Sequence, residues 1–187
     1  MGQITYPKPV KLIFSIISSK DDIFTKGKHR LIEIYGPIDM ESEYQLFDFT
    51  DYYKSEMGNC LKQKLVTFEK LITPDMLSQI KCDSNHLELQ LSMDNKNIGQ
   101  TTQRKVNFDP GYLTLGKFVL ASTKNGAARI YLNQGIYSEI TLRYVKKSFS
   151  PLEWTYRNYK TDLFIEFLNK VREKYKIQLK EIPKNNN

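Results

Sequence analysis

The sequence has few of the residues that build metal centres and nucleophilic active sites. It contains two histidines and two cysteines in 187 residues, and the cysteines, Cys60 and Cys82, form no CxxC motif. A structural zinc site needs four such ligands, and a Ser-His-Asp or Cys-His mechanism needs a suitably placed histidine. We therefore expect no metal site and two free, buried thiols. The residues identify no cofactor and no oligomeric state.

Long hydrophobic runs are also missing. No run reaches the roughly 18 apolar residues that a membrane span requires. The best candidate, residues 10–17, is interrupted by Lys11 and Ser15, and no small-residue cleavage site follows it. This pattern predicts a buried strand rather than a signal peptide. We expect a cytoplasmic protein without a membrane partner.

Positive charge is abundant and unevenly distributed. Lys and Arg number 28 against 21 Asp and Glu, a net charge of +7. Residues 1–93 carry 11 basic and 13 acidic side chains, whereas residues 94–187 carry 17 and 8. A basic half is typical of a protein that binds nucleic acid, a nucleotide or a phosphorylated metabolite, and also of a solvated basic surface. About half of this excess lies on the predicted final helix and tail, where it favours solubility.

The order of predicted elements favours an α+β fold. The length of the chain is that of one domain, which we place at residues 1–180, followed by a flexible tail at 181–187. Strand and helix patterns alternate with short connections, which predicts a mainly antiparallel sheet with packed helices. One arrangement of these elements is a βαββαβ ferredoxin-like core extended by a C-terminal hairpin and helix.

Several segments in the middle of the chain have distinct local patterns. Residues 61–71 alternate like a strand, and Asp109-Pro110-Gly111 predicts a turn after a strand at 104–108. Residues 114–123 are apolar without alternation and favour a buried helix. Residues 85–93 fit both a strand, from alternating leucines, and a helix, from a capping-box pattern, so both interpretations stay open.

Residues 129–143 predict a β-hairpin. Their apolar and polar side chains alternate on either side of residues 133–135, which predicts a three-residue loop with Gly135 in the left-handed conformation. In this register Leu132 faces Ile136, and the apolar residues share one face.

The polar face of this hairpin pairs chemically versatile side chains. Arg129 faces Glu139, and Tyr131 faces Tyr137. One interpretation is an exposed sheet face with a cross-strand salt bridge. The other is one wall of a polar ligand site, because these groups hydrogen-bond anions and bases.

The last predicted helix, residues 161–175, has one apolar face. Its buried side chains are expected to be Phe164, Phe167, Leu168, Val171 and Tyr175. The opposite face and the tail are rich in lysine and predict a solvated surface.

Two motifs resemble known phosphate or metal sites without completing them. Residues 111–117 satisfy G-x-x-x-x-G-K, but Phe118 stands where a P-loop needs Ser or Thr, and the interior is bulky. Asp48, Asp51 and Glu56 carry oxygen ligands that suit magnesium, but their spacing matches no calcium-loop pattern. Solvation or pairing with internal bases is the favoured interpretation of these acids.

Longer motifs in the chain resemble those of a known family. They are FTDYYKSEMG at 49–58, TFE at 67–69, VNFDPGYL at 106–113, RIYL at 129–132, GIY at 135–137 and WTY at 154–156. The chain resembles an uncharacterised bacterial domain-of-unknown-function family of about 180 residues, whose members are often labelled "GTP-binding protein". Neither a complete P-loop nor an Asn-Lys-x-Asp motif supports that label. The family often has His before the hairpin arginine and Pro-Asp after WTY, where this chain has Ala128 and Arg157-Asn158.

The resemblance selects twelve polar residues as candidate ligand-binding positions. They are Tyr53, Glu56, Glu69, Asn107, Asp109, Tyr112, Lys117, Lys124, Arg129, Tyr131, Tyr137 and Glu139. The favoured hypothesis is a module that binds a phosphorylated or nucleotide-like small ligand, with RNA a weaker alternative partner, through lysine or arginine charge and tyrosine stacking.

Two other functions remain open from the sequence. The first is a metal-assisted enzyme on a small phosphorylated metabolite, with Glu56, Glu69 or Glu139 as general acid or base. The second is a ligand-free structural or assembly protein, in which the polar face is an interface.

Overall fold

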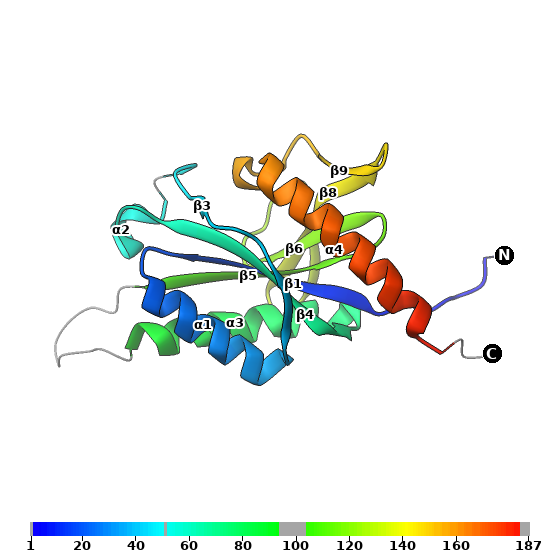
Figure 1. Ribbon diagram of the computed structural model, residues 1–187, viewed down its shortest axis with the longest axis horizontal. Helices are drawn as coiled ribbons and strands as arrows, with labels where there is room; N and C mark the ends of the chain where they lie inside the picture. The colour runs from blue at the N-terminus through cyan, green and yellow to red at the C-terminus, as the bar shows by residue number, and fades with distance from the viewer. Residues whose placement is uncertain (1, 51, 94–103, 184–187) are drawn as a thin grey trace.

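The computed structural model describes residues 2–50, 52–93 and 104–183 (Figure 1). A nine-stranded antiparallel sheet has the order β2-β4-β1-β5-β6-β8-β7, with β3 on β4 and β9 on β8. The strands are β1 (Val10–Ser18), β2 (Ile38–Glu41), β3 (Gln45–Leu46), β4 (Lys62–Ile72), β5 (Val106–Leu113), β6 (Lys117–Ser122), β7 (Ile130–Asn133), β8 (Ile136–Val145) and β9 (Ser148–Pro151). The helices are α1 (Asp21–Tyr35), α2 (Lys54–Met57), α3 (Leu77–Met93) and α4 (Asp162–Glu181), with short 3-10 turns at Pro74–Met76 and Arg157–Tyr159.

The first half of the sheet has ferredoxin-like connectivity. The elements β1-α1-β2-β4-α3-β5 follow a βαββαβ order, and their strands lie in the spatial order β2-β4-β1-β5. The short elements β3 and α2 are inserted between β2 and β4, whereas β6 to β9 and α4 extend the core. The predicted α+β fold with a mainly antiparallel sheet is therefore confirmed. None of the described helices is long and apolar enough to cross a membrane.

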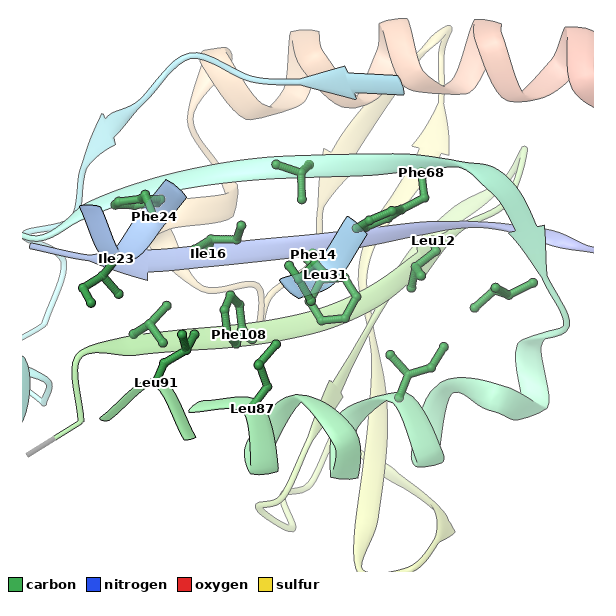
Figure 2. Packing of buried hydrophobic residues seen from close by; sticks show 14 of the residues in the cluster. Leu12, Phe14, Ile16, Ile23, Phe24, Leu31, Phe68, Leu87, Leu91 and Phe108 are labelled. Atoms are coloured by element: carbon green, nitrogen blue, oxygen red, sulfur yellow. The ribbon is translucent and has the colours of Figure 1, made fainter. Parts of the chain in front are cut away.

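Helices cover both faces of the sheet. In Figure 1, α1 and α3 lie on one side and α4 lies on the other. Leu12, Phe14 and Ile16 of β1 point toward α1 and α3, where Figure 2 shows them packed with aromatic and aliphatic side chains of both helices. Ile13 joins the second core, under α4. Because both faces are covered, every residue of β1 is buried.

The prediction of a helix at residues 114–123 is wrong, because most of this segment forms β6. This strand pairs with β5 on one side and with β8 on the other. Its residues from Phe118 to Ala121 are all buried. A strand with both faces covered lacks polar alternation, so its sequence resembles that of a buried helix.

Two other segments of the middle region lie in a helix and in a strand. Residues 85–93 belong to α3, with Leu87 and Leu91 one turn apart in the core. Asp109-Pro110-Gly111 does not form the predicted turn but lies inside β5. The G-x-x-x-x-G-K segment therefore spans a β-hairpin, whereas a P-loop joins a strand to a helix.

The hairpin of β7 and β8 differs in detail from the prediction. Tyr131 pairs with Tyr137 as expected, but Asn133 rather than Leu132 pairs with Ile136. The loop has two residues, because Gln134 and Gly135 take the left-handed φ values of 54° and 76° that a two-residue turn needs. Register shifts in β7–β8 and β6–β8 break the alternation, so Ile130 is 71% exposed and Glu139 only 6% exposed.

The C-terminal helix α4 confirms the predicted apolar face. Its buried residues are the five that the sequence indicates, and the helix continues beyond the expected end to Glu181. Residues 184–187 of the expected flexible tail lie outside the described part of the chain. Both cysteines are free, but the prediction that they are buried is wrong for Cys60, which is exposed, and Cys82 is only partly buried.

Candidate functional site

A cavity lies where two neighbouring strands of the sheet separate. β5 and β6 pair over only three residue pairs, from Gly111↔Leu120 to Leu113↔Phe118. The part of β5 before this pairing and the end of β6 line a cavity of about 1030 Å³. The cavity also contacts α3, residues 47–50, residues 52–56 and residues 153–160. We call it the main cavity. A Cβ on Gly111 would lie 2.3 Å from the Val119 carbonyl oxygen, so only glycine allows the strands to meet this closely before they part.

Where β5 no longer pairs with β6, side chains of α3 form hydrogen bonds with the backbone of β5. The Phe108 N–H donates to Glu88 Oε1 at 2.7 Å, and Lys81 Nζ donates to the Phe108 carbonyl at 2.7 Å. Lys81 and Glu88 lie seven residues apart, two turns along the same face of the helix. Pro110, two residues beyond Phe108, faces the same edge and has no N–H to satisfy.

A charged network lines the floor of the main cavity. Lys81 Nζ lies 3.1 Å from Asp109 Oδ1, and the Asn107 amide donates to Asp109 Oδ2 at 2.7 Å. The Arg104 guanidinium donates to Asn107 Oδ1 at 3.2 Å and lies 3.4 Å from Glu88 Oε2. Each of these acids thus has a basic partner.

Arg104 also connects this floor to the wall at residues 53–56. Its Nη2 lies 2.9 Å from Glu56 Oε2, and its guanidinium carbon lies 5.1 Å from the centre of the Tyr53 ring. Burial raises the pKa of the Tyr53 hydroxyl, so this phenol stays protonated and can donate a hydrogen bond.

Glu88 is the buried carboxyl of this network. Burial raises its pKa to about 7, against the opposing effects of Lys81, the Phe108 N–H and Arg104. Asp109 adds to the increase by repulsion. Glu88 therefore changes charge near neutral pH, which ordinary glutamates do not.

Arg129 ties the opposite wall together. Its Nε donates to Glu139 Oε2 at 2.8 Å, which confirms the predicted ion pair. Its Nη1 donates to Ser122 Oγ and to the Lys124 carbonyl, and its Nη2 donates to the Tyr156 hydroxyl at 2.9 Å. Four bonds fix this guanidinium, so it positions the wall more than it offers free charge. The second oxygen of Glu139 is buried and accepts no hydrogen bond from the described residues.

In the rest of the main cavity, basic side chains outnumber acidic ones among the described residues. Lys124, Arg157 and Lys160 line it, and none forms an ion pair within residues 2–50, 52–93 and 104–183. Glu153 is the one lining carboxylate of the described chain without a basic partner there. The surplus in this part of the cavity is therefore cationic.

Aromatic rings lie beside this surplus. Lys124 Nζ is 3.9 Å from the centre of the half-exposed Tyr52 ring. Trp154 and Tyr156 also line the main cavity, and the Trp154 indole is fixed by donating to the Ile140 carbonyl at 2.9 Å. Cations together with exposed aromatic faces are the groups that hold a phosphate and a planar ring.

The structure brings together seven of the twelve candidate positions. Those that line the main cavity are Tyr53, Glu56, Asn107, Asp109, Lys124, Arg129 and Glu139.

The other five candidate positions lie outside the main cavity. Glu69 is exposed on β4, and Lys117 is exposed at the start of β6. Tyr112 packs against hydrophobic clusters, and Tyr131 and Tyr137 contact each other with ring centres 5.4 Å apart.

Lys81 and Glu88 were missed by the sequence analysis. Once α3 is known to be a helix, both fall on the buried stripe that includes Leu77, Ser84 and Leu91. Charged side chains on the buried stripe of a helix nearly always have ionic or hydrogen-bonding partners. This pattern could have identified Lys81 and Glu88 from the sequence. Tyr156 ends the WTY motif and Arg157 follows it, and the role of both depends on contacts with distant segments.

The described residues contain no group of three or more His, Cys, Asp or Glu side chains that could hold a metal ion. Asp51, one of the three acids considered for magnesium, lies outside those residues. Glu56 instead pairs with Arg104.

The fold and the cavity define an α+β domain with a ferredoxin-like core and a split sheet. The chain belongs to the family described as Domain of unknown function (DUF4416), whose family model matches residues 8–175. This confirms the resemblance found in the motifs. The bacterial origin stays a prediction, and the family match does not support the GTP-binding label. Comparison with curated proteins and with solved structures finds no match.

Proposed function

We propose that the main cavity binds a small phosphorylated ligand that carries a planar ring, such as a nucleotide. The observation that carries this proposal is the surplus of Lys124, Arg157 and Lys160 over acidic partners among the described residues, beside the rings of Tyr52 and Trp154. Phosphate oxygens accept charge-assisted hydrogen bonds from lysine and arginine, and an exposed ring face stacks on a base.

The size and polarity of the cavity support a small ligand. Its volume of about 1030 Å³ lies near the upper end of the usual range for small-molecule sites, about 300–1,000 Å³. Tyr53, Asn107 and the paired acids add directional hydrogen-bonding groups on the floor. RNA stays the weaker candidate because few basic residues of the cavity lack an acidic partner among the described residues, whereas affinity for a nucleic-acid backbone grows with each phosphate contact.

Acid–base chemistry on the bound ligand is a second candidate function. The favouring observation is the Glu88 carboxyl, whose pKa of about 7 suits a group that gains and loses protons at neutral pH. Glu56 and Glu139 are held in ion pairs, and Glu69 lies outside the main cavity. Glu88 also lies 3.4 Å from Arg104, but burial raises its pKa to about 7, which makes it a better candidate for this role than the three glutamates selected from the sequence.

A thermal-shift panel tests the binding proposal. Nucleoside monophosphates, sugar phosphates and inorganic phosphate are each added with and without magnesium. We expect a phosphorylated compound to raise the melting temperature of the wild type by mass action, and the Arg157→Ala/Lys160→Ala variant to lose most of that increase. A shift that requires magnesium favours the enzyme hypothesis.

The matched control removes two lysines from another surface. Lys170→Ala/Lys180→Ala deletes the same charge from exposed positions of α4 and should respond like the wild type. No response to any compound of the panel contradicts the proposal. Equal losses in both variants mean that net charge, not the cavity, causes the shift.

A further inference from the structure

A second, smaller cavity adjoins the main one. It has a volume of about 350 Å³ and lies beside the end of β1 and the start of α1. Four basic side chains and one carboxylate line it. The basic residues are Lys20, Lys54, Arg104 and Lys105, and the carboxylate belongs to Glu56. We call it the lysine cavity.

The positive charge of the lysine cavity is not cancelled within it. Arg104 and Glu56 neutralise each other at 2.9 Å. Lys20 and Lys105 form no ion pair with any residue of the described ranges. At least two positive charges thus remain in a concave space, where low-dielectric walls concentrate the field.

One buried serine holds the backbone segments of Lys20 and Lys105 together. Ser18 Oγ donates to the Lys105 carbonyl at 2.8 Å and accepts from the Lys20 N–H at 3.2 Å. Ser18 is fully buried, and it pairs with Val106 in the sheet. These bonds use backbone atoms of the lysines, so their positions do not depend on the ammonium groups.

The lysine cavity and the main cavity share a wall. Glu56 and Arg104 line both, and their ion pair lies at the boundary. Both side chains are partly exposed, at 49% and 26%. A ligand that extends past this pair from the main cavity therefore reaches Lys20 and Lys105.

We propose that the lysine cavity is a phosphoryl-binding subsite, and that it receives the distal phosphoryl group of a ligand with a diphosphate or longer chain. The shared occupancy rests on the function proposed for the main cavity, whereas the affinity of the subsite for phosphate does not. Lysine ammonium groups act as mobile point charges that suit tetrahedral phosphate oxygens. A volume of about 350 Å³ is ample for such a group.

Calorimetric titration with inorganic pyrophosphate tests the subsite alone. The wild type should bind pyrophosphate at low salt, and Lys20→Ala/Lys105→Ala should bind about tenfold more weakly or not at all. Lys20→Arg/Lys105→Arg should retain binding because it keeps both charges. Lys26→Ala/Lys170→Ala, which removes two exposed helical lysines elsewhere, is the matched control and should bind like the wild type.

Two results overturn the subsite. One is a wild type that does not bind pyrophosphate. The other is an equal loss of affinity in the test and control variants, which assigns the binding to net charge. The Arg157→Ala/Lys160→Ala variant should still bind pyrophosphate, so the subsite can be confirmed even where the proposal for the main cavity fails.

A comparison of AMP with ADP tests whether one ligand spans both cavities. ADP should bind the wild type about tenfold more tightly than AMP, and Lys20→Ala/Lys105→Ala should abolish this difference while leaving AMP affinity unchanged. An ADP affinity equal to that of AMP in the wild type overturns the shared ligand. Weakening of AMP and ADP by the same factor overturns it as well.

Discussion

Two charged networks tie helices to this sheet, and they differ in what surrounds them. Around Asp39 of β2, the carboxylate is bonded by Thr67 of the adjacent strand β4, by Lys11 of β1 and by Lys174 of α4. The side chains of Lys11 and Asp39 are 0% and 1% exposed, and Gln178 accepts the other bond from Lys11 at 2.9 Å. We call this the Asp39 network.

The network of the main cavity uses the same residue types in open surroundings. Lys81, Glu88, Arg104 and Asp109 join α3 to β5, as the Asp39 network joins α4 to the other face. Beside it lie cations without acidic partners in the described chain. The paired and buried charges of the Asp39 network fit a structural role, whereas the charge in excess of its partners next to open space is the basis for the proposed ligand site.

The largest effect is expected from breaking the Asp39 network. Asp39→Asn removes the acid that two lysines share, which leaves buried positive charge uncompensated and should reduce the free energy of unfolding by about 3–5 kcal/mol. Urea denaturation measures this loss. A loss below about 1 kcal/mol would show that the network is not structural.

A milder change covers the case in which Asp39→Asn does not fold. Thr67→Val removes one hydrogen bond to the same carboxylate and should cost about 1–3 kcal/mol. Binding of a phosphorylated ligand to the folded variant should be unchanged. A change in affinity would contradict the separation of the two networks.

The second largest effect is a difference in pH dependence. The Glu88 carboxyl has a folded pKa of about 7 against an ordinary value of 4.5, because burial raises it. Between these values the folded state binds more protons than the unfolded state, so stability falls as pH rises through this window, by up to about 3 kcal/mol. Unfolding titrations of the wild type and of Glu88→Gln, from pH 4 to pH 8, should show that the variant lacks this fall.

Asp39 should show the opposite sign. Although burial acts to raise its pKa, hydrogen bonds from Lys11 and Thr67 lower it below the ordinary value. The Asp39 carboxylate therefore contributes to stability above its unfolded pKa, and this contribution is lost as pH falls through its folded pKa.

An identical pH profile in Glu88→Gln and the wild type between pH 4.5 and pH 7 would refute the role assigned to Glu88.

A smaller loss of stability is expected from removing Lys81, which bonds to the backbone of β5 where β6 does not pair with it. Lys81→Met removes the donor to the Phe108 carbonyl and should cost about 1–3 kcal/mol, because a buried acceptor is left without a partner. Denaturation by urea measures it. As a control, Lys26→Met on the exposed surface of α1 should change stability by less than about 0.5 kcal/mol.

Local patterns predicted the elements whose contacts are near in sequence. The apolar stripe of α4 and the pairing of Tyr131 with Tyr137 follow from helical and strand periodicity. The Arg129–Glu139 pair was also predicted, since it depends on one hairpin. The register shift that buries Glu139 was not, because it arises from pairing with β6.

The floor of the main cavity was beyond local reasoning. β6 resembles a buried helix in sequence because both of its faces are covered, and the strands that pair with it come from segments before and after it. Lys81 and Glu88 gain their roles only because β5 separates from β6 and leaves Phe108 to be satisfied. Such contacts depend on tertiary packing, which overrides local propensity.

The smallest effect on stability should come from the unpaired cations. Arg157→Ala/Lys160→Ala removes exposed charges without buried partners and should change the free energy of unfolding by less than about 0.5 kcal/mol. A loss above about 1 kcal/mol would mean that these side chains are structural, like those of the Asp39 network.

The most direct test of the account is the ligand affinity of that same variant. Isothermal titration calorimetry of the phosphorylated compound that most stabilises the wild type should give a dissociation constant at least about tenfold higher for Arg157→Ala/Lys160→Ala, with wild-type affinity in Lys170→Ala/Lys180→Ala. Equal affinities in the wild type and in Arg157→Ala/Lys160→Ala would contradict the claim that surplus charge in the main cavity binds the ligand.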